Sequence, residues 1–135
     1  FSSSTKIVYR FIAPELLPDS VASLPVDVAD TKSYRSGAGD YLNYSFKKYV
    51  ESIDEYPDGY FDLILVDGRA RPSCILHSIP KLKSGGLLVV DNAERSYYLA
   101  KTQSLLSKFT KHEFTGSIPS LYSYVQTNVY EKPAS

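Results

Sequence analysis

The sequence of 135 residues has no methionine, no tryptophan and a single cysteine, Cys74. One cysteine excludes an internal disulfide and a zinc site made of cysteines, so a reducing compartment is the default. No apolar run approaches the roughly 20 residues that cross a membrane, and no charged and then apolar signal peptide opens the chain. We therefore expect a cytoplasmic protein without a membrane partner. Because even an initiator methionine is lacking, we also expect a fragment or a processed chain.

The chain also lacks an excess of charge of either sign, because its 15 basic and 15 acidic side chains sum to +0. A protein with no surplus of Lys and Arg gains little from displacing the counterions of phosphates. The composition therefore gives no indication of a nucleic-acid partner, although recognition by a local patch stays open.

The length and the even composition predict a single domain over residues 1–135, which is small for a complete doubly wound enzyme. Residues 14–43 are its least regular part, with three prolines, two glycines and many Ser and Asp residues. We predict a long loop there. Such loops are uncommon inside compact domains unless they are functional or mobile.

Residues 61–92 contain two short runs of Leu, Ile and Val, and each run ends in an aspartate, Asp67 or Asp91. Such runs are typical of strands buried on both faces, as the central strands of a parallel sheet are. In open α/β sheets, ligands bind beyond the carboxyl ends of the strands. Two neighbouring strands that both end in an acid therefore predict a site.

Periodicity and turn residues predict the remaining elements. They are a strand over Lys6–Ile12; a helix with Phe46, Tyr49, Val50 and Ile53 on one face, capped by Asn43 or Ser45; a helix from Pro72 to Leu82, ended by Ser84–Gly86; a helix from about Arg95 to Phe109; and a strand over Leu121–Tyr130, paired antiparallel with Lys111–Gly116. Strands that alternate with helices pair in parallel through right-handed crossovers, so the predicted fold class is α/β.

The run YFDLILVDGRAR, followed by PKLKSGGLLVVDNAER, resembles the fourth and fifth strands of class I S-adenosylmethionine-dependent methyltransferases. The resemblance covers roughly Lys6 to the end of the chain and is specific in residues 61–92. It implies a three-layer, Rossmann-like methyltransferase fold with a mostly parallel seven-stranded sheet, whose last two strands form an antiparallel pair. It also implies S-adenosylmethionine as the cofactor and methyl transfer to a small-molecule acceptor.

Two parts of the family's pattern have no equivalent here, namely the glycine-rich loop after the first strand and the acid that ends the second strand. Ser36–Asp40 contains Gly-x-Gly, but no apolar strand precedes it, and the roughly twenty residues before Phe61 leave no room for two crossovers. We therefore expect the carboxyl-terminal portion of such an enzyme, truncated at the N-terminus and inactive alone, with little affinity for the cofactor. The Lys6–Ile12 strand would lack its usual neighbours, so a homo-oligomer is also expected.

Asp67, Asp91 and Asn92 are the candidate catalytic residues, and two explanations of them stay open. Two carboxylates and an amide oxygen at neighbouring strand ends suit Mg²⁺. Their placement resembles the metal site of catechol-type O-methyltransferases, where the metal lowers the pKa of a substrate hydroxyl. Alternatively, Asp67 turns the chain and Asp91–Asn92 caps the next element, while Arg69 and Arg71 neutralise the carboxylates.

Residues that follow the two acids are candidates for binding the substrate. Arg69 and Arg71 either orient an anionic substrate through their guanidinium forks or form a structural pair with Asp91 or Glu94. Further along the chain, the residues positioned to line an acceptor pocket are Glu94, Arg95 and Tyr97.

The resemblance also implies residues that contact the cofactor. The family often has an acid after its third strand, so Asp40 and Tyr41 are expected near the adenine. Asp67 and Gly68, at the end of the fourth strand, complete the predicted cofactor-binding set.

His77 and His112 show no partner pattern, and we expect both to be structural or exposed. Cys74 lies beside apolar positions, which predicts a buried and inert thiol. Two alternatives to a methyltransferase stay open. One is a non-catalytic α/β scaffold or assembly module of the same fold. The other is an aminopropyltransferase-like enzyme, which also has an acid after its fourth strand but carries further acids near its acceptor.

Overall fold

A computed structural model describes residues 6–118 and 123–134. Its strands and helices, with the 3₁₀ helices labelled η, are β1 (Glu15–Leu16), α1 (Asp19–Ala22), η1 (Gly39–Tyr41), β2 (Tyr44–Ser45), α2 (Lys47–Glu51), η2 (Ser52–Glu55), β3 (Phe61–Val66), α3 (Arg71–Ser78), η3 (Ile79–Lys81), β4 (Leu82–Val90), η4 (Ser96–Tyr98), α4 (Gln103–Leu106), β5 (Thr110–Ile118) and β6 (Ser123–Glu131).

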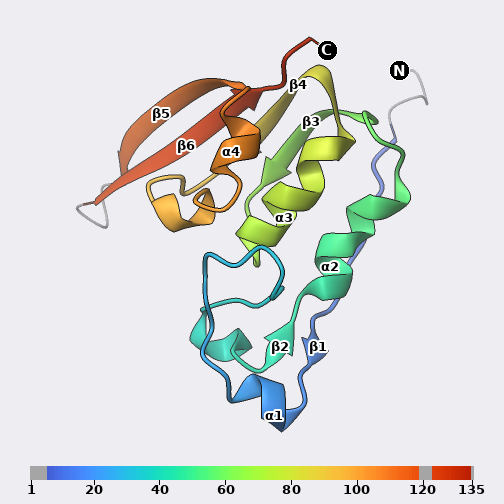
Figure 1. The fold of residues 1–135 in the computed structure, drawn as a ribbon, viewed down its shortest axis with the longest axis vertical. Coiled ribbons are helices and arrows are strands. Elements are labelled where there is room, and N and C mark those ends of the chain that lie inside the picture. The colour runs from blue at the N-terminus through green and yellow to red at the C-terminus, as the bar shows by residue number, and fades with distance from the viewer. Residues whose placement is uncertain (1–5, 119–122, 135) are drawn as a thin grey trace.

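The main sheet has four strands in the order β3-β4-β6-β5 (Figure 1). β3 and β4 pair in parallel, with α3 in the connection between them, and β6 lies antiparallel between β4 and β5. The protein is therefore a mixed α/β domain. The predicted antiparallel pair at the end of the chain is confirmed, except that Leu121 and Tyr122 lie outside the described residues.

One face of this sheet carries the core. Ile75 of α3 and Leu106 of α4 pack with Leu88 and Val90 of β4 and with Tyr130 of β6. Side chains alternate between the two faces of a strand, which brings Leu88, Val90 and Tyr130 to the same side. The predicted helix at Pro72 is confirmed by α3 and η3, because its apolar side chains meet this face.

The opposite face of the sheet is open to solvent. Leu63 and Leu65 of β3 are 53% and 59% exposed, and Phe114 of β5 is also exposed. The prediction that the Phe61 strand is buried on both faces is therefore wrong. In the described part of the chain, β3 is an edge strand and α3 and α4 lie on one side of the sheet, so two layers are seen where three were predicted (Figure 1).

The predicted strand over Lys6–Ile12 is wrong, because this segment has no secondary structure. Ile7 and Tyr9 are 90% and 85% exposed, and Arg10 forms an ion pair with Glu55 of η2. The segment runs beside α2 (Figure 1). Alternation of apolar residues gives a strand only where another strand supplies hydrogen bonds. In the described structure, no strand pairs with this segment.

The helix predicted near Tyr49 is present as α2 and η2. Phe46 holds the cap position and makes no side-chain cap bond. Ser45, one of the two predicted caps, lies one position earlier, and its Oγ accepts a hydrogen bond from Lys47 N–H, the first amide of α2, at 3.2 Å.

The single helix predicted from about Arg95 to Phe109 is also wrong, since only η4 and α4 form there. Thr102 is fully buried at the cap position of α4, and its hydroxyl donates to the Leu99 carbonyl at 3.3 Å. Threonine side chains compete in this way with the backbone bonds of a helix, which accounts for the break.

The Ser84–Gly86 turn lies inside β4 instead of before it, because the strand already begins at Leu82. Gly85 has a φ of +78°, and a Cβ on Gly86 would lie 2.9 Å from the Lys83 carbonyl and 3.0 Å from that of Asp62. The glycines allow β4 to bend closely past β3, with a shift in register after Phe61.

Residues 14–43, for which a long loop was predicted, contain the short elements β1, α1 and η1 and are held together by a buried arginine. The Arg35 guanidinium donates to the carbonyls of Val21, Ala22, Leu24 and Leu42 at 2.8 to 3.4 Å. β1 also pairs with β2 in a second, two-stranded sheet. Arg35 thus replaces the backbone pairing that regular structure would provide.

Candidate functional site at the ends of β3 and β4

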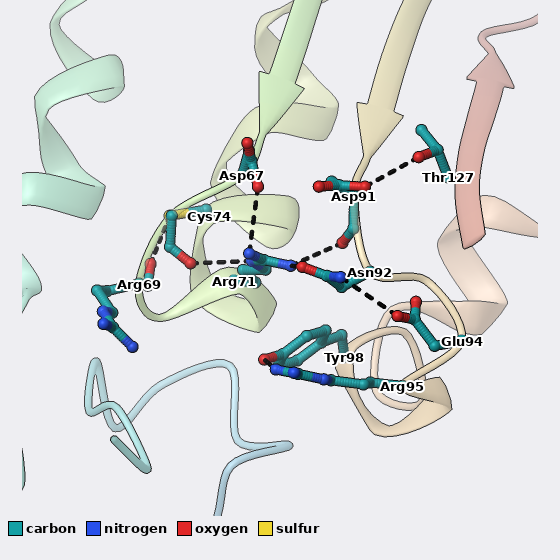
Figure 2. A network of polar contacts seen from close by, with 11 residues as sticks. Asp67, Arg69, Arg71, Cys74, Asp91, Asn92, Glu94, Arg95, Tyr98 and Thr127 are labelled. Carbon is teal, nitrogen blue, oxygen red and sulfur yellow. Dashed lines mark hydrogen bonds and ion pairs between the residues drawn. The ribbon is translucent and has the colours of Figure 1, made fainter. Parts of the chain in front are cut away.

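The two aspartates that follow the parallel strands meet at one edge of the sheet (Figure 2). Val66 and Val90 are register partners at the last position of each strand, and Asp91 N–H donates to the Val66 carbonyl at 3.2 Å. Asp67 and Asp91 therefore begin the two loops side by side. The prediction that the acid-ended strands are neighbours is confirmed.

Arg71, in the first turn of α3, connects the two loops. Its guanidinium donates to Asp67 Oδ1 at 3.2 Å, to the Gly68 carbonyl at 2.9 Å, to the Asp91 carbonyl at 2.8 Å and to Asn92 Oδ1 at 2.7 Å. The Arg71 side chain is only 12% exposed, and its guanidinium also lies 5.3 Å from the centre of the Tyr98 ring. One planar fork thus fixes both strand ends, which a point charge could not do.

The backbone adapts to this arrangement at two positions. Ala70 and Asn92 have left-handed φ values of 50° and 54°. Asparagine tolerates this region better than most residues, whereas alanine is strained there. The turn at Ala70 allows α3 to begin at Arg71. The turn at Asn92 brings the side-chain amide of Asn92 to the Arg71 guanidinium.

Asp91 is held from β6 as well. Thr127 Oγ donates to Asp91 Oδ1 at 2.9 Å. Partial burial acts to raise the pKa of the Asp91 carboxyl, but the hydrogen bonds from the Thr127 hydroxyl and from Asn92 N–H and the charge of Arg71 outweigh it. The pKa of Asp91 therefore lies below its ordinary value, and the group is a carboxylate at neutral pH.

Replacing Thr127 with valine is expected to raise the pKa of Asp91 towards its ordinary value, because the strongest favourable hydrogen bond is lost. A group with a lowered folded-state pKa adds stability above its unfolded pKa of about 4, and that stability is lost as the pH falls through the folded-state pKa. The urea midpoint of Thr127→Val should therefore depend less on pH in the acid range. A carboxyl NMR titration of Asp91 measures the shift directly. Thr115→Val on β5 is the control, and an unchanged Asp91 pKa would contradict the assignment.

Glu94 ties the Asn92 loop to β6. Its Oε1 accepts from Asn92 Nδ2 at 3.2 Å, and its Oε2 accepts from Gln126 N–H at 3.2 Å. Glu94 therefore positions Asn92 and does not face the same space as Asp67.

A cavity of about 570 Å³ opens in front of the Asp67 loop. Its walls come from three parts of the chain: the loop after β3, the loop after β4 and the long loop. They are Val28, Arg35, Ser36, Gly37, Ala38, Asp67, Gly68, Arg69, Ala70, Arg71, Pro72, Asn92, Arg95, Tyr97 and Tyr98. A volume of this size is typical of small-molecule sites.

Most of the predicted site residues are brought together by this cavity, and four are not. Asp40 and Tyr41 in η1 are absent from its walls, as are Asp91 and Glu94. Tyr41 packs against Phe46 and lies 4.9 Å below the Arg69 guanidinium. A Cβ on Gly68 would lie 2.6 Å from the Tyr49 hydroxyl, so a larger residue there would have to displace that side chain.

The magnesium hypothesis does not fit this arrangement of Asp67, Asp91 and Asn92. Arg71 already donates to Asp67 Oδ1 and Asn92 Oδ1, so a guanidinium lies where a divalent cation would have to bind both. Within residues 6–118 and 123–134, no three or more His, Cys, Asp or Glu side chains are grouped to hold a metal ion. The open alternative, in which Arg71 neutralises the carboxylate, matches the observed contacts.

The long loop contributes residues to the cavity wall that the sequence did not predict as site residues. No sequence motif marks Arg35 as a site residue, and the sequence predicts a loop at Ser36–Ala38 and no cofactor cradle, yet these residues line the cavity. The role of Thr127 could not be predicted either. The alternating pattern of a strand does not show which of the strand's hydroxyl groups lies near a carboxylate that is distant in the sequence.

The remaining titratable groups lie outside the cavity. His77 Nδ1 is 2.9 Å from Asp54 Oδ1, and His77 Nε2 is 3.3 Å from the Tyr34 hydroxyl, which agrees with a structural role. His112 is exposed on β5. Burial raises the pKa of the Cys74 thiol to about 12 and outweighs the opposing charge of Arg71, so this thiol is inert at neutral pH.

No protein-family model matches the chain, and no curated protein matches it either. The fold and the cavity are therefore interpreted from their own chemistry. Over the described ranges, no helix combines the length and the apolar character that crossing a membrane requires.

Proposed function

We propose that this chain carries the acceptor side of a class I S-adenosylmethionine-dependent methyltransferase site. The observation that carries the proposal is Asp67, which follows a parallel strand and lines a cavity of about 570 Å³ beside a second acid-ended strand. Ligands of open α/β sheets bind at such strand ends.

The strand order supports the proposal at the level of the fold. The parallel β3–β4 pair with α3 between its strands, followed by the antiparallel β5–β6 pair, agrees with the last part of the sheet that the resemblance implies. A Rossmann-like sheet remains part of the proposal.

The two acids are suited to different roles. Asp67 lines the cavity and its side chain is 51% exposed, so it can reach an acceptor and receive the acceptor's proton. Asp91 does not line the cavity, and its lowered pKa makes it a weaker base. Asp91 therefore helps to hold Asn92 and the Asp67 loop in position, and Arg71 orients Asp67.

The described residues do not form a complete pocket for S-adenosylmethionine. That cofactor supplies an activated methyl group on a positively charged sulfur, whereas the cavity is lined by four arginines, Arg35, Arg69, Arg71 and Arg95. Asp40 and Tyr41, the residues expected near the adenine, are not among its walls. For this reason the proposal assigns the acceptor side to these residues and leaves only Asp67 and Gly68, which follow β3, in contact with the cofactor, as the resemblance implies.

Of the alternatives, the assembly module is favoured by one observation, the exposed apolar face that carries Leu63, Leu65 and Phe114. Exposed apolar patches of this kind often mark interaction surfaces. The aminopropyltransferase alternative is less favoured, because Asp67 is the only carboxylate among the described residues that line the cavity.

The test is a calorimetric titration of S-adenosylmethionine into the protein at its full natural length. We expect stoichiometric binding that Asp67→Ala weakens by about tenfold, the effect of one lost charged contact. The control is Asp62→Ala, which removes an exposed acid from β3, the strand that Asp67 follows, and should leave the dissociation constant unchanged. Failure of the full-length protein to bind the cofactor, or an unchanged constant in Asp67→Ala, would count against the proposal.

A further inference from the structure

The cavity has a strong excess of positive charge although the whole chain has none. Four of its lining residues are arginines, Arg35, Arg69, Arg71 and Arg95, and a single one, Asp67, is acidic among those the structure describes. The formal charge of the chain is +0. The arginines are therefore concentrated at one place, where the cavity walls strengthen their combined field.

Two of the four arginines are already engaged in structural contacts. Arg71 is bound to Asp67 and to the loop after β4. Arg35 donates through both terminal nitrogens to backbone carbonyls, and its Nε is buried without a hydrogen-bond partner in the described structure. Carbonyl groups satisfy donors but do not cancel the charge, so Arg35 still contributes a positive potential.

Arg69 and Arg95 are the two arginines able to contact a ligand. Arg69 lies over the Tyr41 ring, with 4.9 Å from Cζ to the ring centre. Arg95 contacts the Tyr98 hydroxyl at 3.1 Å. Neither forms an ion pair with a carboxylate within residues 6–118 and 123–134, as Figure 2 illustrates for the residues it draws. Aromatic contacts of this kind orient a guanidinium without pairing it with a carboxylate.

The start of α3 adds to the same field. α3 runs from Arg71 to Ser78, and Arg71 and Pro72 in its first turn line the cavity. The N-terminus of a helix carries a partial positive charge. This contribution is minor beside the arginines, but it has the same sign.

We infer that the cavity binds a small molecule through an oxyanion, either a phosphate or a carboxylate group, held by Arg69 and Arg95. Guanidinium forks bind both groups through paired hydrogen bonds. The inference rests on the proposed function in one respect, because it makes the methyl acceptor an anionic molecule. Asp67 then faces the part of the acceptor that is not held by the arginines.

The experiment is a calorimetric titration of the full-length protein with inorganic phosphate and, separately, with acetate, in 50 and 200 mM salt. The Arg69→Gln/Arg95→Gln variant is expected to bind the preferred anion at least about tenfold more weakly, since two charged hydrogen-bonding groups are lost. The control variant, Lys32→Gln/Lys108→Gln, removes the same charge outside the cavity and should change affinity by less than twofold. Higher salt should weaken binding to the wild type more than to the arginine variant.

The relative affinities for phosphate and acetate identify the group that the ligand carries, and preference for either supports the inference. The Arg69→Lys/Arg95→Lys variant keeps the charge but loses the forks, so it should have intermediate affinity and also shows whether the fold tolerates these positions. The inference is overturned if neither anion binds. It is also overturned if Lys32→Gln/Lys108→Gln loses as much affinity as Arg69→Gln/Arg95→Gln. Anion binding without any S-adenosylmethionine binding would overturn the proposed function and leave the anion site standing.

Discussion

Replacing Arg71 with alanine is expected to lower the free energy of unfolding by about 3 kcal/mol, because hydrogen bonds to a charged group are worth roughly 1.5 to 3 kcal/mol each when their partners stay buried. Arg71 donates to the Gly68 and Asp91 carbonyls and to Asn92 Oδ1 at 2.7 to 2.9 Å. Its contact with Asp67 adds little, since that carboxylate is half exposed. Urea unfolding followed by circular dichroism measures the change.

Arg69→Ala is the matched control for this experiment, since it removes the same kind of side chain two residues away, from the loop before α3. Arg69 is exposed and stacks on Tyr41, so its loss should cost less than about 1 kcal/mol. Arg71→Lys should recover only part of the stability, because an ammonium group cannot reach two loops as a planar fork does. Equal losses in Arg69→Ala and Arg71→Ala would show that Arg71 does not join the two strand ends.

Leu88→Ala is expected to cost about 3 kcal/mol, whereas Leu65→Ala should cost less than about 1 kcal/mol. Leu88 of β4 is fully buried against α3 and α4, so its truncation leaves a cavity. Leu65 lies one strand away on the other face and is 59% exposed, so water already contacts most of it. Both substitutions remove the same atoms, which makes this pair a direct test of the one-sided core.

Thermal or urea unfolding at low protein concentration measures the loss of stability in each of the two variants. If Leu65→Ala proves as destabilising as Leu88→Ala at the lowest concentration, the second face of the sheet is covered and the two-layer description fails. A loss for Leu65→Ala that appears only at high concentration would instead indicate that copies of the chain associate through this face.

The elements near residues 61–92 were predictable because their signals are local. An apolar run with an aspartate at its end, a proline in the first turn of a helix and a pair of glycines all act through the backbone of a few residues. β3, α3 and β4 follow from them, and so does the meeting of Asp67 and Asp91 at one edge. The predicted strand at Lys6–Ile12 failed because a strand depends on a neighbour that its own sequence does not supply.

The sequence by itself determined that two acid-ended parallel strands would lie side by side with arginines after the first. Only the tertiary structure decided what each group does. It joined Arg71 to Asn92 across 21 residues, brought Thr127 to Asp91 across 36 and turned the Arg35 loop towards the strand ends. It also left Leu65 in water while burying Leu88. The physical reason is that backbone propensity acts over a few residues, whereas the partner of a charge and the cover of a sheet face depend on packing between distant segments.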